Sequence, residues 1–304
     1  MYAPHYVKSL GEEQTRKQNF RFWNFPVRPA KIGAVDIFEL EKTIGLSIPD
    51  AIKNKVTGLD FVVDKVGLSQ SLVALSDEVT LKISSLSFDI DNEMRNYRSL
   101  KDKLPIPEIL ECVVDDGRIY LLKRKLKGKM LCHADYMGNP DLLYSLASEA
   151  IRRLWSVDIN GLDLQDSWKT VMDFGRYHLR EGNLDFHNAD QEIVTGFSGF
   201  AEILNYLEEK KPKSDLSLVH GDLCLTNIIC DEDRLVGFID LGLTGISDHY
   251  HDLAILYRSI KYNFAGRYGK PYPGYEENKL FDMLGIAKDE QRIRYYLLLD
   301  EVLG

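Results

Sequence analysis

Long hydrophobic runs, a secretion signal and extended basic tracts are all missing from this sequence of 304 residues. No uninterrupted apolar run approaches the roughly 20 residues needed to span a bilayer, and the N-terminus lacks a basic segment followed by an apolar one. No lysine or arginine tract could follow a phosphate backbone, and the formal net charge is -9. We therefore expect a cytoplasmic protein with no membrane or nucleic-acid partner. The negative net charge favours a cationic small molecule as its partner.

Cysteine is scarce as well. The four cysteines, Cys112, Cys132, Cys224 and Cys230, include no close CxxC pair, and no histidines are spaced to complete a zinc site with them. We expect free thiols in a reducing compartment rather than a disulfide framework.

The amino-acid composition is that of a compact folded protein. Apolar residues make up 44% of the chain, enough to fill one large domain or two lobes that share a core. Residues 1–45 are an N-terminal extension of unknown role. Its aromatic residues around Trp23 could dock on the main body or on a second subunit, or the segment could be a partly ordered tail; monomer and dimer both stay open.

Spacing patterns divide the rest of the chain into a β-rich and a helical part. Residues 60–66, 71–75 and 78–83 read as short antiparallel strands, residues 89–103 as a helix and residues 118–122 as a further strand. After a basic connector, the spacing becomes helical over 141–156, 164–180 and 199–209. We predict an α+β protein with a small antiparallel β lobe at 46–125 and a larger, mainly helical lobe at 126–304.

The most informative segment is 218–257. Two apolar strand-like runs, 227–230 and 235–239, flank a turn at 231–233, so that Asn227 begins one strand and Asp240 ends the other. A hairpin of this size brings the two side chains near one another. An amide oxygen and a carboxylate are hard ligands that suit Mg²⁺, which nucleotide phosphates usually complete. The hairpin therefore predicts a magnesium site for Asn227 and Asp240.

Asp222 lies on the loop that enters this hairpin. There its carboxylate could accept the proton of an attacking hydroxyl while a metal neutralises a phosphoryl group, which is the division of tasks in a kinase. We give His220 a structural role, because an imidazole can brace nearby carbonyls. Asp252 either binds backbone groups of the catalytic loop or is an ordinary acid at a helix N-terminus.

At these residues the sequence resembles the aminoglycoside 3′-phosphotransferases, which have a protein-kinase-like fold. The resemblance runs from about residue 46 to the end and is most specific in HGDLCLTNI at 220–228, GFIDLGLTGISDHYHDLA at 237–254, RSI at 258–260, FDMLGI at 281–286 and YYLLLDE at 295–301. Choline kinases and other small-molecule kinases resemble the chain in the HGDxxxxN and IDxG pieces only. The family implies a bilobal fold.

The resemblance also implies a nucleotide site in the first lobe. Lys82 matches the strand lysine that reaches the α- and β-phosphates, and Glu93 matches the helix glutamate that pairs with it. Ser69 belongs to a short loop over the phosphates, and the connector 121–128 would bind the adenine edge. The connector is unusually basic, and Thr80 stands at a position where relatives have an aromatic residue, so ATP and GTP both remain open as co-substrate.

For the acceptor, the resemblance implies a polycation held by carboxylates. The candidates are Asp190 and Glu192, on the loop before the catalytic segment, and Asp300 and Glu301 near the C-terminus, with Asp185 and the carboxylate of Gly304 as further possibilities. The chain departs from the family at Leu243, where relatives often have arginine, and at its end, which lacks the usual aromatic residue.

Three hypotheses follow from the sequence. The leading one is transfer of the γ-phosphate of a nucleotide to a drug hydroxyl at the 3′ position, which would confer antibiotic resistance. The second keeps this chemistry with another amino or hydroxylated metabolite as acceptor. The third is a catalytically dead nucleotide-binding protein. A protein kinase is disfavoured, because the HGD loop lacks the HRD sequence and no long activation segment follows Asp240.

Overall fold

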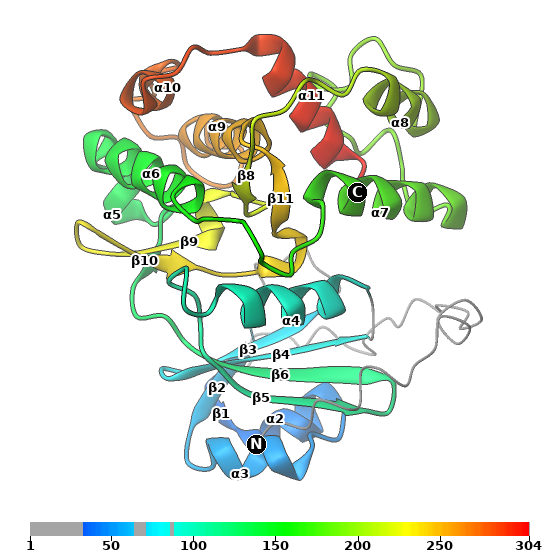
Figure 1. Cartoon of the computed structure of the whole chain (residues 1–304). Helices are drawn as coiled ribbons and strands as arrows, with labels where there is room; N and C mark the ends of the chain where they lie inside the picture. The colour runs from blue at the N-terminus through cyan, green and yellow to red at the C-terminus, as the bar shows by residue number, and fades with distance from the viewer. Residues whose placement is uncertain (1–32, 64–70, 86–87, 304) are drawn as a thin grey trace.

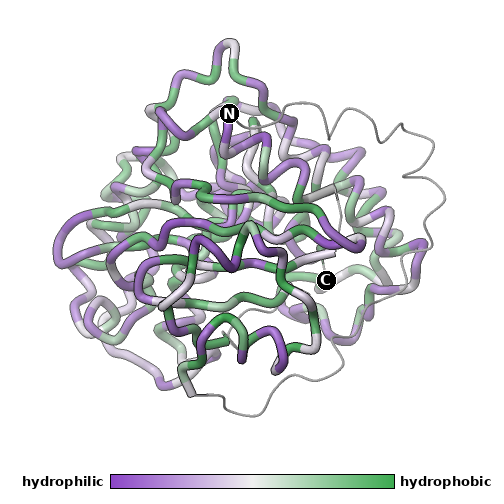
Figure 2. The backbone as a smooth tube through the Cα atoms, turned by 90° about the horizontal axis from the view of Figure 1, so that it is seen from below, coloured by the Kyte–Doolittle hydropathy of each residue, from purple (hydrophilic) through white to green (hydrophobic). Residues whose placement is uncertain are grey.

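The computed structural model describes residues 33–63, 71–85 and 88–303, which form two lobes (Figure 1). A small lobe contains an antiparallel sheet, and a larger one consists mainly of helices. This is the predicted α+β, bilobal architecture. Hydrophobic and hydrophilic stretches alternate along the backbone (Figure 2). Among the described helices, none combines the length and the apolar character needed to cross a membrane.

The small lobe is built on a six-stranded sheet with the strand order β1-β2-β3-β4-β6-β5, in which neighbouring strands are antiparallel. Its strands are β1 (Val35–Asp36), β2 (Asp60–Val63), β3 (Leu72–Leu75), β4 (Val79–Ser85), β5 (Ile109–Asp115) and β6 (Arg118–Arg124). The sequence patterns predicted β2, β3, β4 and β6. They missed β5, whose residues are all intermediate or exposed and so lack a clear alternation.

The small lobe begins earlier than the predicted boundary at residue 46. Helix α2 (Ile37–Ile44) and helix α3 (Asp50–Val56) pack against the sheet, and Ile37, Leu40 and Ile44 belong to its hydrophobic core. Spacings of three and four residues put these three side chains on one face of the helix. Residues 35–44 are therefore part of the small lobe, while residues 1–32, including the aromatic cluster, lie outside the described residues.

The large lobe packs its helices around a second hydrophobic core. Its helices are α5 (Ala134–Met137), α6 (Pro140–Trp155), α7 (Ser167–Glu181), α8 (Phe200–Glu209), α9 (Tyr250–Phe264), α10 (Lys279–Leu284) and α11 (Glu290–Glu301). Its strands form the sheets β10-β9-β7 and β11-β8: β7 (Lys129–Met130), β8 (Leu216–Val219), β9 (Ile228–Asp231), β10 (Arg234–Phe238) and β11 (Gly245–Asp248).

The β9–β10 hairpin differs in detail from the predicted one. Asn227 ends the 3₁₀ turn η2 (Leu225–Asn227) instead of beginning the strand, and Asp240 follows β10 by two residues, before the 3₁₀ turn η3 (Leu241–Leu243). The backbone N–H of Ile239 donates to the carbonyl of Asn227 at 3.1 Å. The two candidate metal ligands therefore flank the hairpin just outside its ladder.

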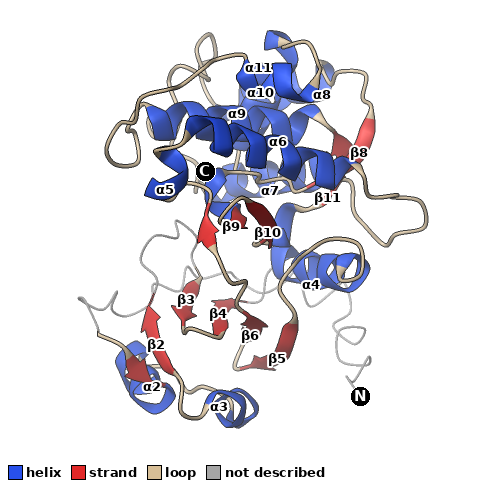
Figure 3. Cartoon of the chain, turned by 90° about the vertical axis from the view of Figure 1, so that its left-hand side faces the viewer, coloured by secondary structure: helices blue, strands red, loops and turns tan. Residues whose placement is uncertain are grey.

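Helix α4 (Phe88–Leu100) lies at the junction of the lobes, between the small-lobe sheet and the large lobe (Figure 3). Asn92 donates to the carbonyl of Gly242 at 2.6 Å. Asn96 donates to the carbonyls of Leu241 and Thr244 at 2.7 and 2.8 Å. Because both asparagines are buried, these three hydrogen bonds fix the helix to the segment that follows Asp240.

Candidate active site

The loop between β8 and η2 is held by one buried carboxylate. Asp252, fully buried in α9, accepts the backbone N–H of His220 at 2.7 Å with one oxygen and that of Gly221 at 2.9 Å with the other. Burial raises the pKa of Asp252 to about 7, and the two backbone donors act in the opposite direction. The sequence left two interpretations of Asp252 open, and the structure contains the first: its carboxylate binds backbone groups of the loop that carries Asp222.

His220 is locked in one neutral tautomer. Its Nε2 lies 2.8 Å from the carbonyl of Ile239, which can only accept, and its Nδ1 accepts the backbone N–H of Asp222 at 3.3 Å. Nε2 therefore carries the proton. Burial lowers the pKa of His220, which favours the same neutral state. The imidazole connects the loop that carries Asp222 to the segment that leads into Asp240.

Gly221 occupies a position that only glycine fits well. Its φ is 82°, and a Cβ there would lie 2.3 Å from the carbonyl oxygen of Leu243. The loop can approach η3 this closely because the side chain is missing.

Asp222 and Asn227 are in direct contact. The side-chain amide of Asn227 donates to the carbonyl oxygen of Asp222 at 2.8 Å and to its carboxylate at 2.9 Å. Burial raises the pKa of Asp222 to about 7, and the nearby negative charge of Asp300 adds to the effect. A carboxylate with this pKa is a suitable acceptor for the proton of a hydroxyl at neutral pH.

Two acids and two lysines meet where the lobes face each other. Lys82 on β4 lies 2.9 Å from Glu93 on α4, the ion pair that the family resemblance implies, and 4.0 Å from Asp240. Lys123 on β6 lies 3.2 Å from Glu93 and 3.8 Å from Asp240. Burial of Glu93 would raise its pKa, but the charges of Lys123 and Lys82 outweigh burial and lower the pKa to about 2.

Asp240 itself adopts a left-handed backbone conformation, with φ of 60°, and its side chain is 53% exposed. This exposed carboxylate faces two lysines, and the residue before it, Ile239, binds the carbonyl of the buried Asn227 through its backbone N–H. Such a position suits a metal ion that carries a phosphate. Within the described residues, no group of three or more His, Cys, Asp and Glu side chains could hold a metal alone. The amide oxygen of Asn227 and the carboxylate of Asp240 are hard oxygen donors, which fit a Mg²⁺ ion whose coordination nucleotide phosphates complete.

Sequence reasoning missed Lys123, Asn92 and Asn96. The signal for Lys123 is period-two alternation in β6, which puts residues 121 and 123 on one face of the sheet. The basic run in which it lies hides this pattern. Thr80 is the cross-strand partner of Lys123. The predicted phosphate-loop residue Ser69 lies outside the described residues.

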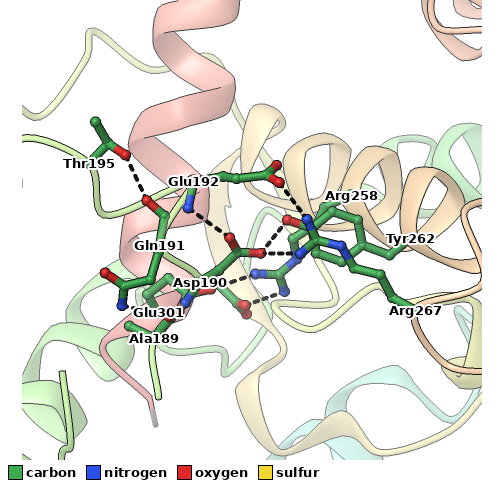
Figure 4. A network of polar contacts seen from close by, with 10 residues as sticks. Ala189, Asp190, Gln191, Glu192, Thr195, Arg258, Tyr262, Arg267 and Glu301 are labelled. Atoms are coloured by element: carbon green, nitrogen blue, oxygen red, sulfur yellow. Dashed lines mark hydrogen bonds and ion pairs between the residues drawn. The ribbon is translucent and has the colours of Figure 1, made fainter. Parts of the chain in front are cut away.

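The acids proposed for the acceptor belong to one polar network (Figure 4). Arg258 of α9 pairs with both Asp300 and Glu301 of α11, the latter at 3.0 Å. The other carboxylate oxygen of Glu301 accepts the backbone N–H of Asp190 at 2.9 Å. This link joins the C-terminal acids to the loop before the catalytic segment.

A second arginine, Arg267, binds the acids on the loop before the catalytic segment (Figure 4). Arg267 donates to Asp190 at 2.9 Å and to Glu192 at 2.7 Å, and its guanidinium lies 3.8 Å from the ring centroid of Tyr262. The Tyr262 hydroxyl also donates to Asp190. With both oxygens occupied and its side chain 14% exposed, Asp190 has little capacity for a ligand, whereas Glu192 is 65% exposed.

The remaining acidic candidates are placed differently. Asp185 accepts hydrogen bonds from His187 and Asn188 within its own turn, and Gly304 lies outside the described residues. Leu243 contributes its backbone carbonyl, which accepts the Ser167 hydroxyl at 2.7 Å. Arg258 and Arg267, the two cations of the network, were not among the predicted site residues.

The fold and the arrangement of these side chains define a protein of the kinase-like phosphotransferase class. The model of the phosphotransferase enzyme family matches residues 64–284, and the chain belongs to this family. It is 30% identical over 271 residues to an aminoglycoside 3′-phosphotransferase of Enterococcus faecalis, which covers 84% of this chain and 98% of the relative.

Solved structures show the same fold. An aminoglycoside 3′-phosphotransferase of type VIII has a TM-score of 0.69 at 23% identity, over 83% of this chain and 97% of that one. An aminoglycoside phosphotransferase of Streptomyces rimosus, solved in complex with ADP and streptomycin, has a TM-score of 0.64 at 22% identity, over 80% and 92% of the two chains.

Proposed function

We propose that this protein transfers the γ-phosphate of ATP to the 3′-hydroxyl of an aminoglycoside. The observation that carries the proposal is the contact of Asp222 with Asn227, next to a cluster in which Asp240 and Glu93 face Lys82. The similarity to aminoglycoside 3′-phosphotransferases supports this class of acceptor. Adding a phosphate would reduce the positive charge on which such drugs depend, and so would confer resistance.

Each side chain has a defined task in this proposal. Asp222 accepts the proton of the attacking hydroxyl, and Asn227 fixes the orientation of its carboxylate. Lys82 binds nucleotide phosphate oxygens, and Glu93 directs the lysine toward them. His220 and Asp252 hold the loop that carries Asp222. Catalysis then depends on the position and charge of fixed groups rather than on a covalent intermediate.

Asn227 and Asp240 would hold Mg²⁺ through an amide oxygen and a carboxylate. The metal would neutralise charge on the transferred phosphoryl group.

For the acceptor, we propose that amino groups of the drug bind Asp300 and Glu192. Glu301, whose two oxygens bind Arg258 and the backbone of Asp190 and whose side chain is 13% exposed, would hold this surface in place. The charge of Asp300 contributes to the raised pKa of Asp222, which supports an amine-binding role for Asp300 close to the proposed base. Asp190, with its internal partners, would shape this surface and order the loop.

The proposal is tested by incubating the protein with MgATP or MgGTP and two sets of acceptors: aminoglycosides with and without a 3′-hydroxyl, and a panel of amino and hydroxylated metabolites. Mass spectrometry should detect a phosphorylated product only with drugs that carry the 3′-hydroxyl. Phosphorylation of a metabolite but of no aminoglycoside would contradict the proposal and favour the general small-molecule kinase.

The pH dependence of the reaction reports on Asp222. Since the ionised form is the base and its pKa is raised to about 7, kcat/KM should rise with pH and level off above neutrality. In Asp300→Asn, one negative charge near Asp222 is lost, so its pKa should fall and the acidic limb should move to lower pH. Asp185→Asn is the matched control and should leave the limb in place. An unmoved limb in Asp300→Asn would contradict the electrostatic coupling.

A further inference from the structure

Lys123 is a charged side chain that the proposed mechanism does not use. The residue is 4% exposed, and its ammonium group lies 3.2 Å from Glu93, 3.8 Å from Asp240 and 5.4 Å from the ring centroid of Tyr97. A lysine is rarely buried to this extent unless it is paired. Its surroundings therefore indicate a specific role rather than a solvated strand residue.

The sheet register places Lys123 beside the phosphate-binding lysine. In the antiparallel β4–β6 pair, Lys82 is opposite Leu121 and Thr80 is opposite Lys123. Residues two apart on a strand point to the same side of the sheet, so both lysines reach the same face. Both lysines bind the carboxylate of Glu93: Lys82 donates to Oε2 and Lys123 donates to Oε1.

Exposure separates the two lysines. The side chain of Lys82 is 14% exposed and that of Lys123 is 5% exposed, while Glu93 is almost fully buried at 1%. A buried carboxylate without a cation is strongly destabilising. If Lys82 moves toward nucleotide phosphates, Glu93 needs another positive charge, and Lys123 is already in place to provide it.

We propose that Lys123 is a positioning residue that keeps Glu93 neutralised and thereby frees Lys82 to bind nucleotide phosphates. The inference rests on the proposed function only in that this site binds nucleotide. Lys123 acts through Glu93. The two lysines thus have different tasks: Lys123 anchors the glutamate, and Lys82 contacts the ligand.

The test measures binding of a fluorescent ATP analogue with Mg²⁺, which needs no acceptor. Lys123→Met should weaken binding about tenfold. Lys82 is then the only strong cationic partner of the buried Glu93, so it stays at the glutamate and contacts the phosphates less well. Lys123→Arg, which keeps the charge, should restore most of the affinity. Lys55→Met is the control: Lys55 lies on α3 of the same lobe, where it pairs with Glu111 and the carbonyl of Leu110, and the variant should bind the analogue like the unmodified protein. Unchanged affinity in Lys123→Met would overturn the proposal.

A double-mutant cycle distinguishes a role of Lys123 in positioning Glu93 from a purely structural role. It also tests the proposal if the single variant Lys123→Met folds poorly. In a Glu93→Gln background the buried charge is gone, so adding Lys123→Met should cause no further loss of affinity. A further loss there would show that Lys123 acts independently of Glu93 and would overturn the proposal. If the unmodified protein phosphorylates no aminoglycoside, the proposed acceptor fails, but this cycle still decides the role of Lys123.

Discussion

An Asp222→Asn variant should lose about 100-fold or more in kcat, because the amide cannot accept the proton of the acceptor hydroxyl. Affinity for magnesium nucleotide should change little, since Asn227 and Asp240 are retained and the new side chain can still accept the hydrogen bond from Asn227. Steady-state kinetics and nucleotide binding measure the two quantities. Undiminished turnover would contradict Asp222 as the base.

The same variant should be more stable than the unmodified protein. The pKa of Asp222 in the folded state is raised to about 7, so ionising the folded protein costs stability. This cost is absent below the ordinary pKa of an aspartate, grows as the pH rises and is complete above about 7. Asparagine removes it, with a gain of a few kcal/mol at most.

Thermal unfolding at two pH values checks this second consequence. The melting temperature of Asp222→Asn should exceed that of the unmodified protein at pH 8, and the two should agree at about pH 3, below the ordinary pKa of an aspartate. Asp233→Asn, at an exposed turn, serves as the control and should change neither kcat nor stability. An equal melting temperature at pH 8 would show that the Asp222 carboxylate carries no burial cost.

Gly221→Ala should be severely destabilising and nearly inactive. The methyl group would lie 2.3 Å from the carbonyl oxygen of Leu243, and a φ of 82° is unfavourable for alanine. Backbone must move, and η3 resists because Asn92 and Asn96 hold it. We expect a loss of about 3–5 kcal/mol in the free energy of unfolding, the range of an exceptional point mutation.

Gly182→Ala is the matched control for this substitution. Gly182 has a φ of 71° but open space around the position of a Cβ, so alanine there should cost only about 1 kcal/mol for its backbone conformation. Chemical denaturation of both variants separates conformational strain from the collision with η3. Equal losses in the two variants would show that close approach to Leu243 contributes nothing.

The sequence predicted the residues whose spacing is local. Asp222, Asn227 and Asp240 are close along one loop and hairpin, so the motif alone indicates that they meet. Lys82 and Glu93 required the family resemblance, because nothing in a strand and the following helix specifies which lysine pairs with which acid. Helix α2, before the predicted boundary at residue 46, contributes to the core of the small lobe; the sequence did not indicate it, because the helix is short and follows a segment without a clear pattern.

The partners contributed by distant segments could not be predicted. Arg258 and Arg267 neutralise acids that lie more than forty residues away in sequence, and charge patterns do not reveal such pairs. The acids alone suggested an open binding surface for a polycation. The structure shows that part of this negative charge already has internal arginine partners, which reduces the number of carboxylates available to an acceptor.

The three hydrogen bonds from Asn92 and Asn96 to the segment after Asp240 have a consequence for regulation. Many protein kinases are switched off by swinging the glutamate-bearing helix away from the lysine strand. In this chain that movement would break three buried amide–carbonyl bonds and leave their groups without water or partner. These hydrogen bonds hold α4 against the segment that follows Asp240. We therefore expect the active site to stay assembled without a switch, so that the supply of its two substrates sets the rate.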